Sequence, residues 1–308
     1  MNFQTIEMLK KMGSETNPLR TKELNQLDEL GYCLLEPSKS IMSYLGKDLN
    51  YMRSKIDYLL DKEGELSGYE GREEFYKKGK KFEPIASRLG NLPNKDRVFM
   101  NFVMLPHLLW SSFHIIKRDI MLSSSNFREP LKGSGQQRLH IDWKPLTKIS
   151  TNYECVIAMM YLDDSKKENG AIKVVPGSHK LTGYPDKYCN PYLEHKKSLT
   201  VEAKAGSIII LNCNIWHRGS ENISGERRRI INAIYRWRSL KQGLNQKMYI
   251  DDKIKDSLKN EEKYFLKIRD NDPTQEEKIY GPGNDYRDWL KKNPKFNFSS
   301  FKNIISNS

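Results

Sequence analysis

Residues Ala205–Arg229 read AGSIIILNCNIWHRGSENISGERRR, and this stretch decides the class of fold. Its apolar, β-branched first half predicts two strands, at Ser207–Leu211 and Asn214–His217. The Gly-, Ser- and Asn-rich second half predicts a turn, after which Arg229–Trp237 is again rich in β-branched and aromatic residues. Strands joined by turns, with no helix between them, favour antiparallel β structure.

The chain before this stretch continues the pattern of short strands separated by Gly, Pro, Asn and Asp. We expect further strands at Asp119–Ser124, Arg138–Asp142, Glu154–Leu162, Ala171–Val175 and Ser198–Glu202. No helix-length periodic segment lies between them, which argues against a sheet of alternating strands and helices. About eight short strands in succession predict an all-β sandwich or barrel.

Helical patterns precede this region. A short helix is expected to begin with Thr21 as its N-cap and to end at Gly31, before a strand at Tyr32–Leu35. The spacing of apolar residues from Ser38 to about Glu65 predicts one long amphipathic helix, and Pro106 to Lys117 predicts another.

The remaining segments show weaker patterns. Residues 1–20 have no firm periodicity, and the polar, Gly-interrupted residues 62–83 predict an exposed connection. We therefore expect one domain over residues 1–308, mainly β with flanking helices. A mainly helical layer spans 1–118, a β-barrel core spans 119–238, and a helical C-terminal wrap with a frayed tail spans 239–308.

Composition bounds the partners and the location. The 308 residues include 52 Lys and Arg against 39 Asp and Glu, a formal net charge of +13. Basic clusters at Lys77–Lys81, Arg227–Arg229 and Arg236–Lys241 come without a zinc finger or an RNP-type motif, so nucleic acid is not the favoured partner. No uninterrupted run of about 18 apolar residues predicts a membrane span. Without a signal-peptide pattern, and with four widely spaced cysteines, the chain is expected to be cytoplasmic.

His140-Ile141-Asp142 suggests a metal site. Residues two apart in a strand point to the same side, about 6–7 Å apart at their bases, so both side chains can reach one ion. A second histidine would complete the two-histidine, one-carboxylate arrangement that holds ferrous iron and leaves coordination positions open. The alternative is a half-buried histidine hydrogen-bonded to a neighbouring aspartate.

His217 and Arg228 supply what this site lacks. His217 ends an apolar strand, and the turn after it leads into the strand that follows Arg228. Both residues would then face one pocket from adjoining strands. An arginine there can bind a carboxylate through two parallel hydrogen bonds, and 2-oxoglutarate needs both an open iron and a cation for its distal carboxylate.

With these residues in place, the chain resembles the phytanoyl-CoA dioxygenase-like family of Fe(II)/2-oxoglutarate oxygenases. The resemblance runs from about Gly31 to Trp237. It is densest in the stretches LSSSNFREPLKGSGQQRLHIDW (Leu122–Trp143), YLDDSKKENGAIKVVPGSHK (Tyr161–Lys180) and Ala205–Arg229, which occur in the family's order. The resemblance implies a double-stranded β-helix, a jelly-roll barrel of the cupin type with helices packed on one face.

The resemblance also implies roles for individual residues. His140, Asp142 and His217 match the iron ligands, and Arg228 matches the arginine that binds the distal carboxylate of 2-oxoglutarate. Arg227 and Arg229 are the alternatives to Arg228. Asn126 and Gln137 lie where relatives place polar contacts to the cosubstrate or the substrate.

Four further residues near the H-x-D segment are candidates for substrate contact. They are Arg128, Arg138, Trp143 and Lys144. The three cations could attract an anionic substrate, whereas ordinary solvation at the surface is the alternative reading for them. Trp143 could pack on a substrate or belong to the core.

The expected function is that of an Fe(II)- and 2-oxoglutarate-dependent dioxygenase. With O2 as a further cosubstrate, it would hydroxylate a small organic substrate and release succinate and CO2. Asp142 favours hydroxylation, desaturation or ring formation over halogenation, because related halogenases replace this carboxylate. Two alternatives remain open: an oxidative demethylase of nucleic acid on the same fold, and a non-catalytic metal-binding barrel acting as a sensor or scaffold.

Overall fold

The computed structural model describes residues 3–67, 69–71, 84–149 and 151–268. Its helices are α1 (Gln4–Lys11), α2 (Thr21–Glu29), α3 (Lys39–Leu45), α4 (Leu49–Glu63), α5 (Arg97–Val103), α6 (Pro106–Ile116), α7 (Gln246–Tyr249), α8 (Asp252–Ser257) and α9 (Asn260–Leu266). Its strands are β1 (Tyr32–Leu35), β2 (Tyr69–Gly71), β3 (Pro84–Leu89), β4 (Ile120–Pro130), β5 (Cys155–Tyr161), β6 (Ile172–Val175), β7 (Leu199–Val201), β8 (Ile208–Asn212), β9 (Trp216–Arg218) and β10 (Ile230–Trp237).

The strands form two antiparallel sheets. The larger sheet has the order β1-β8-β5-β10-β4-β3-β2, and the smaller has the order β7-β6-β9. In the larger sheet β10 lies between β4 and β5, so that Asn232 stands opposite Asn126 on one side and Met159 on the other. Neighbouring strands that are distant in the sequence are typical of barrels built from crossed connections.

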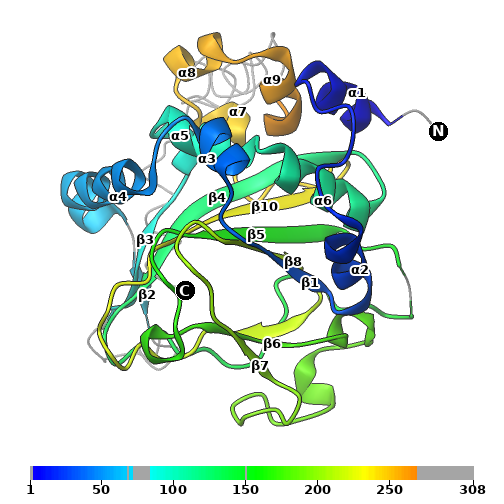
Figure 1. The fold of residues 1–308 in the computed structure, drawn as a ribbon, viewed down its shortest axis with the longest axis vertical. Coiled ribbons are helices and arrows are strands. Elements are labelled where there is room, and N and C mark those ends of the chain that lie inside the picture. Colours follow the sequence, from blue (N-terminus) through cyan, green and yellow to red (C-terminus); the bar gives the residue numbers. More distant parts are fainter. Residues whose placement is uncertain (1–2, 68, 72–83, 150, 269–308) are drawn as a thin grey trace, which may run out of the picture.

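The two faces of the larger sheet have different neighbours. Phe127, Ile231 and Tyr235 point to one face and are buried in the same apolar cluster as α5, α6 and α9. Tyr161 and Ile230 point to the other face and share a second cluster with Val174 of the smaller sheet. Figure 1 shows this layering, with the helices on one side of the larger sheet and β6 and β7 on the other.

The inner face of the larger sheet keeps contact with solvent. Along β4, the outward side chains of Leu122 and Phe127 are fully buried, whereas inward Asn126 and Arg128 are only half-buried. Met159 of β5 is half-buried as well. The alternation indicates an interior that is lined by polar groups and accessible from outside, while the helices seal the opposite face.

The helix expected over Ser38–Glu65 is divided in two, which corrects the sequence prediction. Gly46 ends α3 with a φ of 74°, in the left-handed region that glycine tolerates. Asp48 then begins α4, because its side chain accepts a hydrogen bond of 2.8 Å from the backbone nitrogen of Tyr51. The apolar spacing is continuous across the break, and for that reason the break was missed.

The N-terminal residues are more ordered than their sequence predicts. Part of the 1–20 segment forms α1, whose Thr5 nitrogen donates to Asp119 at 2.8 Å. Thr21 is the first residue of α2 rather than its N-cap. The cap position is Arg20, whose backbone nitrogen donates to the Glu23 carboxylate at 2.8 Å.

Gly31 joins the end of α2 to β1 and holds the PGSH turn against them. Its φ is 82°, and a Cβ atom placed on it would lie 2.4 Å from Nδ1 of His179. The backbone nitrogen of Gly177 donates to the carbonyl of Leu30 at 2.9 Å. Only a glycine fits here, because the imidazole of His179 occupies the space of a side chain.

The β core begins earlier in the chain than predicted. β1, β2 and β3 all join the larger sheet, with β2 and β3 lying at its edge beyond β4. β2 falls within the expected exposed connection 62–83, of which residues 72–83 lie outside the described residues. The expected strand Arg138–Asp142 is reduced to one bridge, between His140 and His217. The division into a single domain stays a prediction.

One apolar segment meets the length and composition of a membrane span. It covers Arg97–Ile116, and 67% of its window is buried inside the structure. It comprises α5 and α6, which pack under the larger sheet as core helices. The segment is interrupted by Asn101, Pro106 and His107, so it is not an uninterrupted apolar run, and its burial fits an internal role. The cytoplasmic location stays a prediction.

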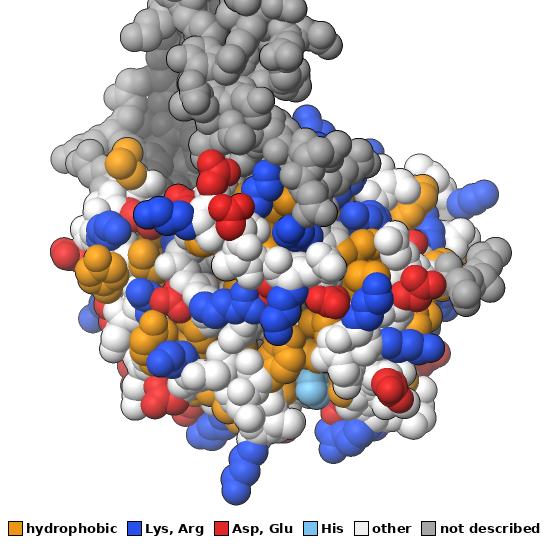
Figure 2. All heavy atoms as spheres, turned by 90° about the horizontal axis from the view of Figure 1, so that it is seen from above, with side chains coloured by type: hydrophobic (Ala, Val, Ile, Leu, Met, Phe, Trp, Pro, Cys, Tyr) orange, Lys and Arg blue, Asp and Glu red, His pale blue; other side chains and the backbone are white. Residues whose placement is uncertain are grey.

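The basic clusters of the sequence lie in different surroundings in the structure. Lys77–Lys81 and most of the expected C-terminal wrap lie outside the described residues. On the helical face, Figure 2 shows Lys and Arg side chains scattered among Asp and Glu rather than gathered in one patch. Arg227 and Arg229 enter ion pairs with Asp57.

Candidate metal centre and its surroundings

His140, Asp142 and His217 come together although 75 or more residues separate His217 from the other two. His217 lies in β9, and His140 stands opposite it, since each backbone nitrogen donates to the other's carbonyl at 3.0 Å. Asp142 follows on the same segment, where its nitrogen donates to the carbonyl of Cys213 at 2.9 Å. The smaller sheet and its bridge therefore set the three side chains.

The ligand atoms of these residues converge. Nε2 of His140 lies 3.5 Å from Oδ1 of Asp142, and Nε2 of His217 lies 3.4 Å from Oδ2. One ligand atom from each residue lies within 4.8 Å of the others. Ligand atoms about 2.0–2.2 Å from one octahedral ion lie about 3 Å apart, so this spacing fits a single metal ion.

Both imidazoles are oriented by backbone carbonyls. Nδ1 of His140 lies 2.9 Å from the carbonyl oxygen of Arg138, and Nδ1 of His217 lies 3.0 Å from that of Ile215. A neutral imidazole that donates from Nδ1 presents the lone pair of Nε2 to the centre. This orientation is typical of metal-binding histidines.

The centre is electrostatically prepared for a cation. Burial opposes ionisation of Asp142, but the His217 and His140 side chains outweigh it and hold the pKa of this carboxyl well below its usual range. Burial lowers the pKa of His217, whereas Asp142 raises it, and the net direction is upward. The carboxylate is thus an anion at neutral pH beside two nitrogen donors.

Ser178 of the PGSH turn supports the strand that carries His217. Its side chain is buried, donates to the carbonyl of Val175 at 2.6 Å and accepts from the nitrogen of Trp216 at 2.8 Å. Val174 is the register partner of His217. The turn therefore fixes the backbone on either side of the histidine. His179 packs instead on Gly31, away from the centre.

Arg228 differs from both of its neighbours. Its side chain is 2% exposed, Nε donates to the carbonyl of Asn169 at 3.1 Å, and Nη2 has no hydrogen-bond partner among the described residues. Arg227 and Arg229 are paired with the carboxylates of Glu129 and Asp163. Burial, with a smaller effect of Arg128, lowers the pKa of Arg228 to about 10, so it remains a cation at neutral pH.

Tyr161 lies beside this arginine on the inner face of the larger sheet. Its side chain is fully buried and its hydroxyl has no hydrogen-bond partner among the described residues. Burial raises the pKa of Tyr161 to about 12, and the nearby Arg228 and the Ser165 hydroxyl oppose that shift. Unsatisfied buried donors are costly, so the two groups fit an anion that would accept from both. The sequence analysis missed Tyr161, because a tyrosine at a strand end gives no distinguishing signal.

Asn126 and Gln137 occupy different places. Asn126 stands on the inner face of β4 opposite Asn232, whose side-chain oxygen accepts from its backbone nitrogen at 3.1 Å. Gln137 Oε1 accepts from the nitrogen of Gly219 at 3.0 Å, two residues beyond His217. Arg128 reaches the same region, with Nη2 lying 3.4 Å from the Gly135 carbonyl.

The other candidates for substrate contact are spread around the metal centre. Arg138 and Lys144 are exposed, whereas Trp143 is half-buried and donates from Nε1 to Glu154 at 3.0 Å. The guanidinium of Arg236 lies 4.3 Å from the centroid of the Trp143 ring. The structure thus brings Trp143 into contact with an arginine that the sequence assigned only to a basic cluster.

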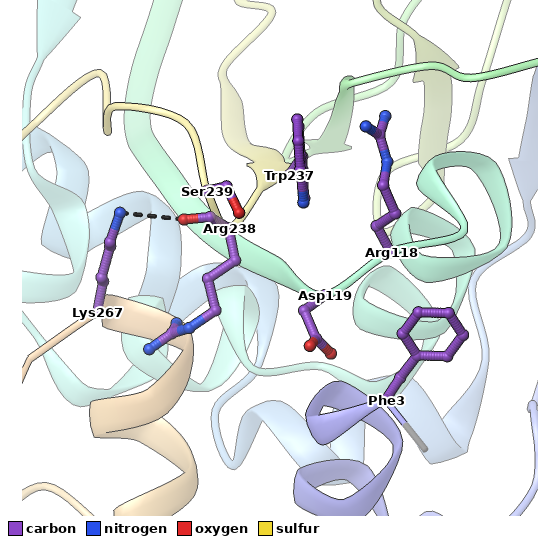
Figure 3. Close-up of a pocket in the computed structure, with 7 residues that line it drawn as sticks. All are labelled: Phe3, Arg118, Asp119, Trp237, Arg238, Ser239 and Lys267. Carbon is purple, nitrogen blue, oxygen red and sulfur yellow. Dashed lines mark hydrogen bonds between the residues drawn. The ribbon is translucent and has the colours of Figure 1, made fainter. Parts of the chain in front are cut away.

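A separate pocket of about 480 Å³ opens among the helices (Figure 3). It is lined by Phe3, Arg118, Asp119, Trp237, Arg238, Ser239 and Lys267. Its lining shares no residue with the metal centre. Lys267 donates to the carbonyls of Arg238 and Leu240, and Arg118 donates to that of Tyr153. These hydrogen bonds join the residues after α9 and α6 to neighbouring segments of the chain, so the pocket side chains that make them have a structural role.

Comparison with known proteins agrees with this geometry. Residues 69–230 match the family model of phytanoyl-CoA dioxygenase (PhyH). The chain is 32% identical over 128 residues to the dioxygenase cnsJ of Penicillium expansum, which covers 39% of this chain and 38% of that protein. The chain spans about two fifths of the length of the curated relatives it matches.

Solved structures share the fold at low sequence identity. HygX of Streptomyces hygroscopicus, solved with nickel and 2-oxoglutarate bound, has a TM-score of 0.55 and 18% identity over 73% of this chain and 89% of that one. SnoK, an alpha-ketoglutarate-dependent carbocyclase from nogalamycin biosynthesis, has a TM-score of 0.54 and 17% identity over 71% of this chain and 84% of that one. The predicted jelly-roll fold is confirmed, and the chain belongs to the phytanoyl-CoA dioxygenase (PhyH) family.

Proposed function

We propose that the protein is an Fe(II)- and 2-oxoglutarate-dependent dioxygenase that hydroxylates a small organic substrate and releases succinate and CO2. The convergence of His140, Asp142 and His217, together with the buried Arg228, whose Nη2 lacks a partner among the described residues, carries this proposal. Membership of the PhyH family supports it. Bound iron and 2-oxoglutarate would supply the activation of O2 and the oxidising power.

The residues of the chain would perform binding and orientation. His140, Asp142 and His217 would hold the metal through two nitrogens and one carboxylate oxygen, leaving positions open for cosubstrates. Arg228 would bind the distal carboxylate of 2-oxoglutarate through charge-assisted hydrogen bonds. Tyr161, Asn126 and Gln137 would add polar contacts around the cosubstrate or the substrate.

Burial makes the Arg228 contact strong. In a site shielded from water, a guanidinium without a carboxylate of its own gains more from binding an anion than an exposed arginine does. Ion pairs of Arg227 with Glu129 and Asp57, and of Arg229 with Asp163, support Arg228 over these two neighbours as the partner of the cosubstrate. Among the residues that the structure describes, Arg228 forms no ion pair with a carboxylate.

The test is turnover of 2-oxoglutarate. Purified protein with Fe(II), ascorbate and air is assayed for succinate, with and without a substrate library, beside His140→Ala. We expect succinate from the wild type and background levels from the variant. Equal turnover in both would refute the ligand assignment. Wild-type protein that binds metal but never consumes 2-oxoglutarate would instead favour the non-catalytic barrel.

The product decides the type of oxidation. Among the structures that share this fold, SnoK is described as a carbocyclase. Hydroxylation adds one oxygen atom to the substrate, whereas ring closure or desaturation removes two hydrogen atoms. Mass spectrometry of the product therefore distinguishes the proposed hydroxylation from the other outcomes.

A further inference from the structure

Four alternate residues of β10 form a row along the inner face of the larger sheet. They are Ile230, Asn232, Ile234 and Arg236, which stand opposite Tyr161, Met159, Ile157 and Cys155 of β5. A strand rises about 3.3 Å per residue, so the row is about 20 Å long. Arg228 lies beyond its first residue, and Arg236 is its last.

The two arginines therefore serve different ends of the interior. Arg228 lies near Tyr161 and Arg128, whose charges affect its pKa. Arg236 lies at the end where Cys155 meets Cys213, whose carbonyl accepts from the nitrogen of Asp142. Asp142, one of the three candidate metal ligands, is thus tied to this end by its backbone. A five-carbon diacid is too short to reach from Arg228 to Arg236.

Arg236 is held against the residue that follows a metal ligand. Its guanidinium carbon lies 4.3 Å from the centroid of the Trp143 ring, a cation–π contact. Trp143 directly follows Asp142, and its Nε1 donates to Glu154 at 3.0 Å, which fixes the ring. The ring of Trp143 thus holds the Arg236 guanidinium against the segment that carries Asp142.

The hydrogen-bonding capacity of Arg236 is largely unused. Nε is buried without a partner, and Nη1 makes one long contact of 3.4 Å with the carbonyl of Lys241. No carboxylate forms an ion pair with it among the described residues. Arg227 and Arg229, by contrast, are neutralised by acidic side chains. A buried, unsatisfied donor is costly unless a ligand accepts from it.

We propose that Arg236, stacked on Trp143, binds an anionic group of the organic substrate, a carboxylate or a phosphate, and so determines substrate specificity. The inference rests on the proposed dioxygenase function, because it assigns the substrate end of that site. Planar guanidinium recognises both anions through paired hydrogen bonds. The anchored anion would hold the rest of the molecule over the open side of the metal centre.

Substrate pairs test this assignment through turnover. A library in which each acid is matched by its methyl ester or amide is screened for succinate release above the substrate-free background. We expect the acids to be turned over and the neutral partners to be poor substrates. Turnover of the neutral members at equal or higher efficiency would overturn the proposal.

Variants then locate the effect. Arg236→Gln should raise KM for the acid at least tenfold and leave KM for 2-oxoglutarate unchanged, while Arg236→Lys recovers part of the loss. Arg238→Gln is the matched control, because Arg238 stacks on Tyr264 at 4.0 Å and lines the separate pocket of Figure 3. An equal rise in KM for 2-oxoglutarate would assign Arg236 to the cosubstrate instead.

A binding measurement makes the inference independent of turnover. Isothermal titration calorimetry of the metal-free full-length protein compares its affinity for two anions, benzoate and phenyl phosphate, with its affinity for neutral benzamide. We expect binding of one or both anions, about tenfold weaker in Arg236→Gln and unchanged in Arg238→Gln. Equal binding of benzamide, or anion binding that survives Arg236→Gln, would refute the site. If anions bind but 2-oxoglutarate is never consumed, the proposed function fails and the anion site stands.

Discussion

The backbones of His140 and His217 exchange two hydrogen bonds, each 3.0 Å from nitrogen to oxygen, so the two imidazoles leave from directly opposed residues. Their ring centroids lie 4.4 Å apart. The same bridge sets the position of both Nε2 atoms relative to Asp142. The metal centre is thus part of the sheet framework and does not depend on the closing of a loop.

Replacing His140 should remove the metal and keep the fold. The backbone bridge does not require an imidazole, so His140→Ala should weaken Co(II) binding by at least 100-fold while the apoprotein melts within a few degrees of the wild type. Visible absorption of Co(II) and thermal unfolding measure the two effects. The control is His114→Ala, which alters a histidine of α6 that is paired with Asp28 of α2. This variant should bind Co(II) normally.

Arg228 should control the affinity for 2-oxoglutarate. Arg228→Gln removes charge-assisted hydrogen bonds worth about 1.5–3 kcal/mol, so KM for 2-oxoglutarate should rise about 10- to 100-fold. Unfolding of the metal-free variant should occur at the same or a higher denaturant concentration, because an unpaired buried charge is lost. Steady-state kinetics and urea titration provide both numbers.

Arg227→Gln provides the contrast for Arg228. Arg227 is half-exposed and paired with Glu129 and Asp57 at the surface. Its loss should cost about 1 kcal/mol of stability or less and leave KM for 2-oxoglutarate unchanged. If Arg227→Gln raises KM for 2-oxoglutarate as much as Arg228→Gln does, the assignment of Arg228 is wrong.

Ser178 should act on the metal centre from a distance. Ser178→Ala leaves the nitrogen of Trp216 and the carbonyl of Val175 without their bridging hydroxyl, at a cost of about 1–3 kcal/mol in the free energy of unfolding. Because Trp216 precedes His217, Co(II) affinity should also fall several-fold. Ser178→Thr, which restores the hydroxyl, should recover Co(II) binding. A stability loss with unchanged metal affinity would confine Ser178 to a structural role.

His179 should make the fold sensitive to acid. Burial, partly offset by the carbonyl of Asp28, lowers the pKa of His179 from 6.5 to about 4. The folded state therefore holds the neutral form. Its contribution to stability is complete above pH 6.5, falls as the unfolded chain binds the proton, and is lost by about pH 4, a change of up to about 3 kcal/mol.

Urea titrations at several pH values from 4 to 7 test this dependence on His179. His179→Gln cannot titrate, so its stability should vary less across the interval than that of the wild type. The difference between the two curves isolates the histidine from the carboxylates that also titrate there. Parallel curves would show that another group causes the acid sensitivity.

The sequence predicted the three residues that converge in the structure, although their role as metal ligands stays a prediction. His140 and Asp142 are two residues apart, and His217 ends an apolar strand, so residue types and spacing sufficed. Choosing among Arg227, Arg228 and Arg229 required the structure. The three residues are chemically identical, and only their burial and their neighbouring carboxylates distinguish them.

The sequence predicted the class of the fold. It did not predict the elements whose structure depends on contacts between distant parts of the chain. β3 begins with a proline and follows a polar segment, and it is a strand because Arg88 and Leu89 pair with Arg128 and Phe127 of β4. The break between α3 and α4 depends on the left-handed backbone of Gly46. Arg236 read as part of a basic surface cluster, since the sequence does not reveal that its side chain turns toward Trp143.

The placement of β10 has a consequence for biosynthesis. It is the last strand of the described residues, yet it fills the middle of the larger sheet between β4 and β5. Until the ribosome has released Trp237, both neighbours expose unpaired edges, which are prone to aggregation. A nascent chain that stops before Ile230 therefore holds all three histidine and aspartate ligands but no completed sheet to position them. Chaperone demand should peak over this interval of synthesis, and acquisition of metal should follow it.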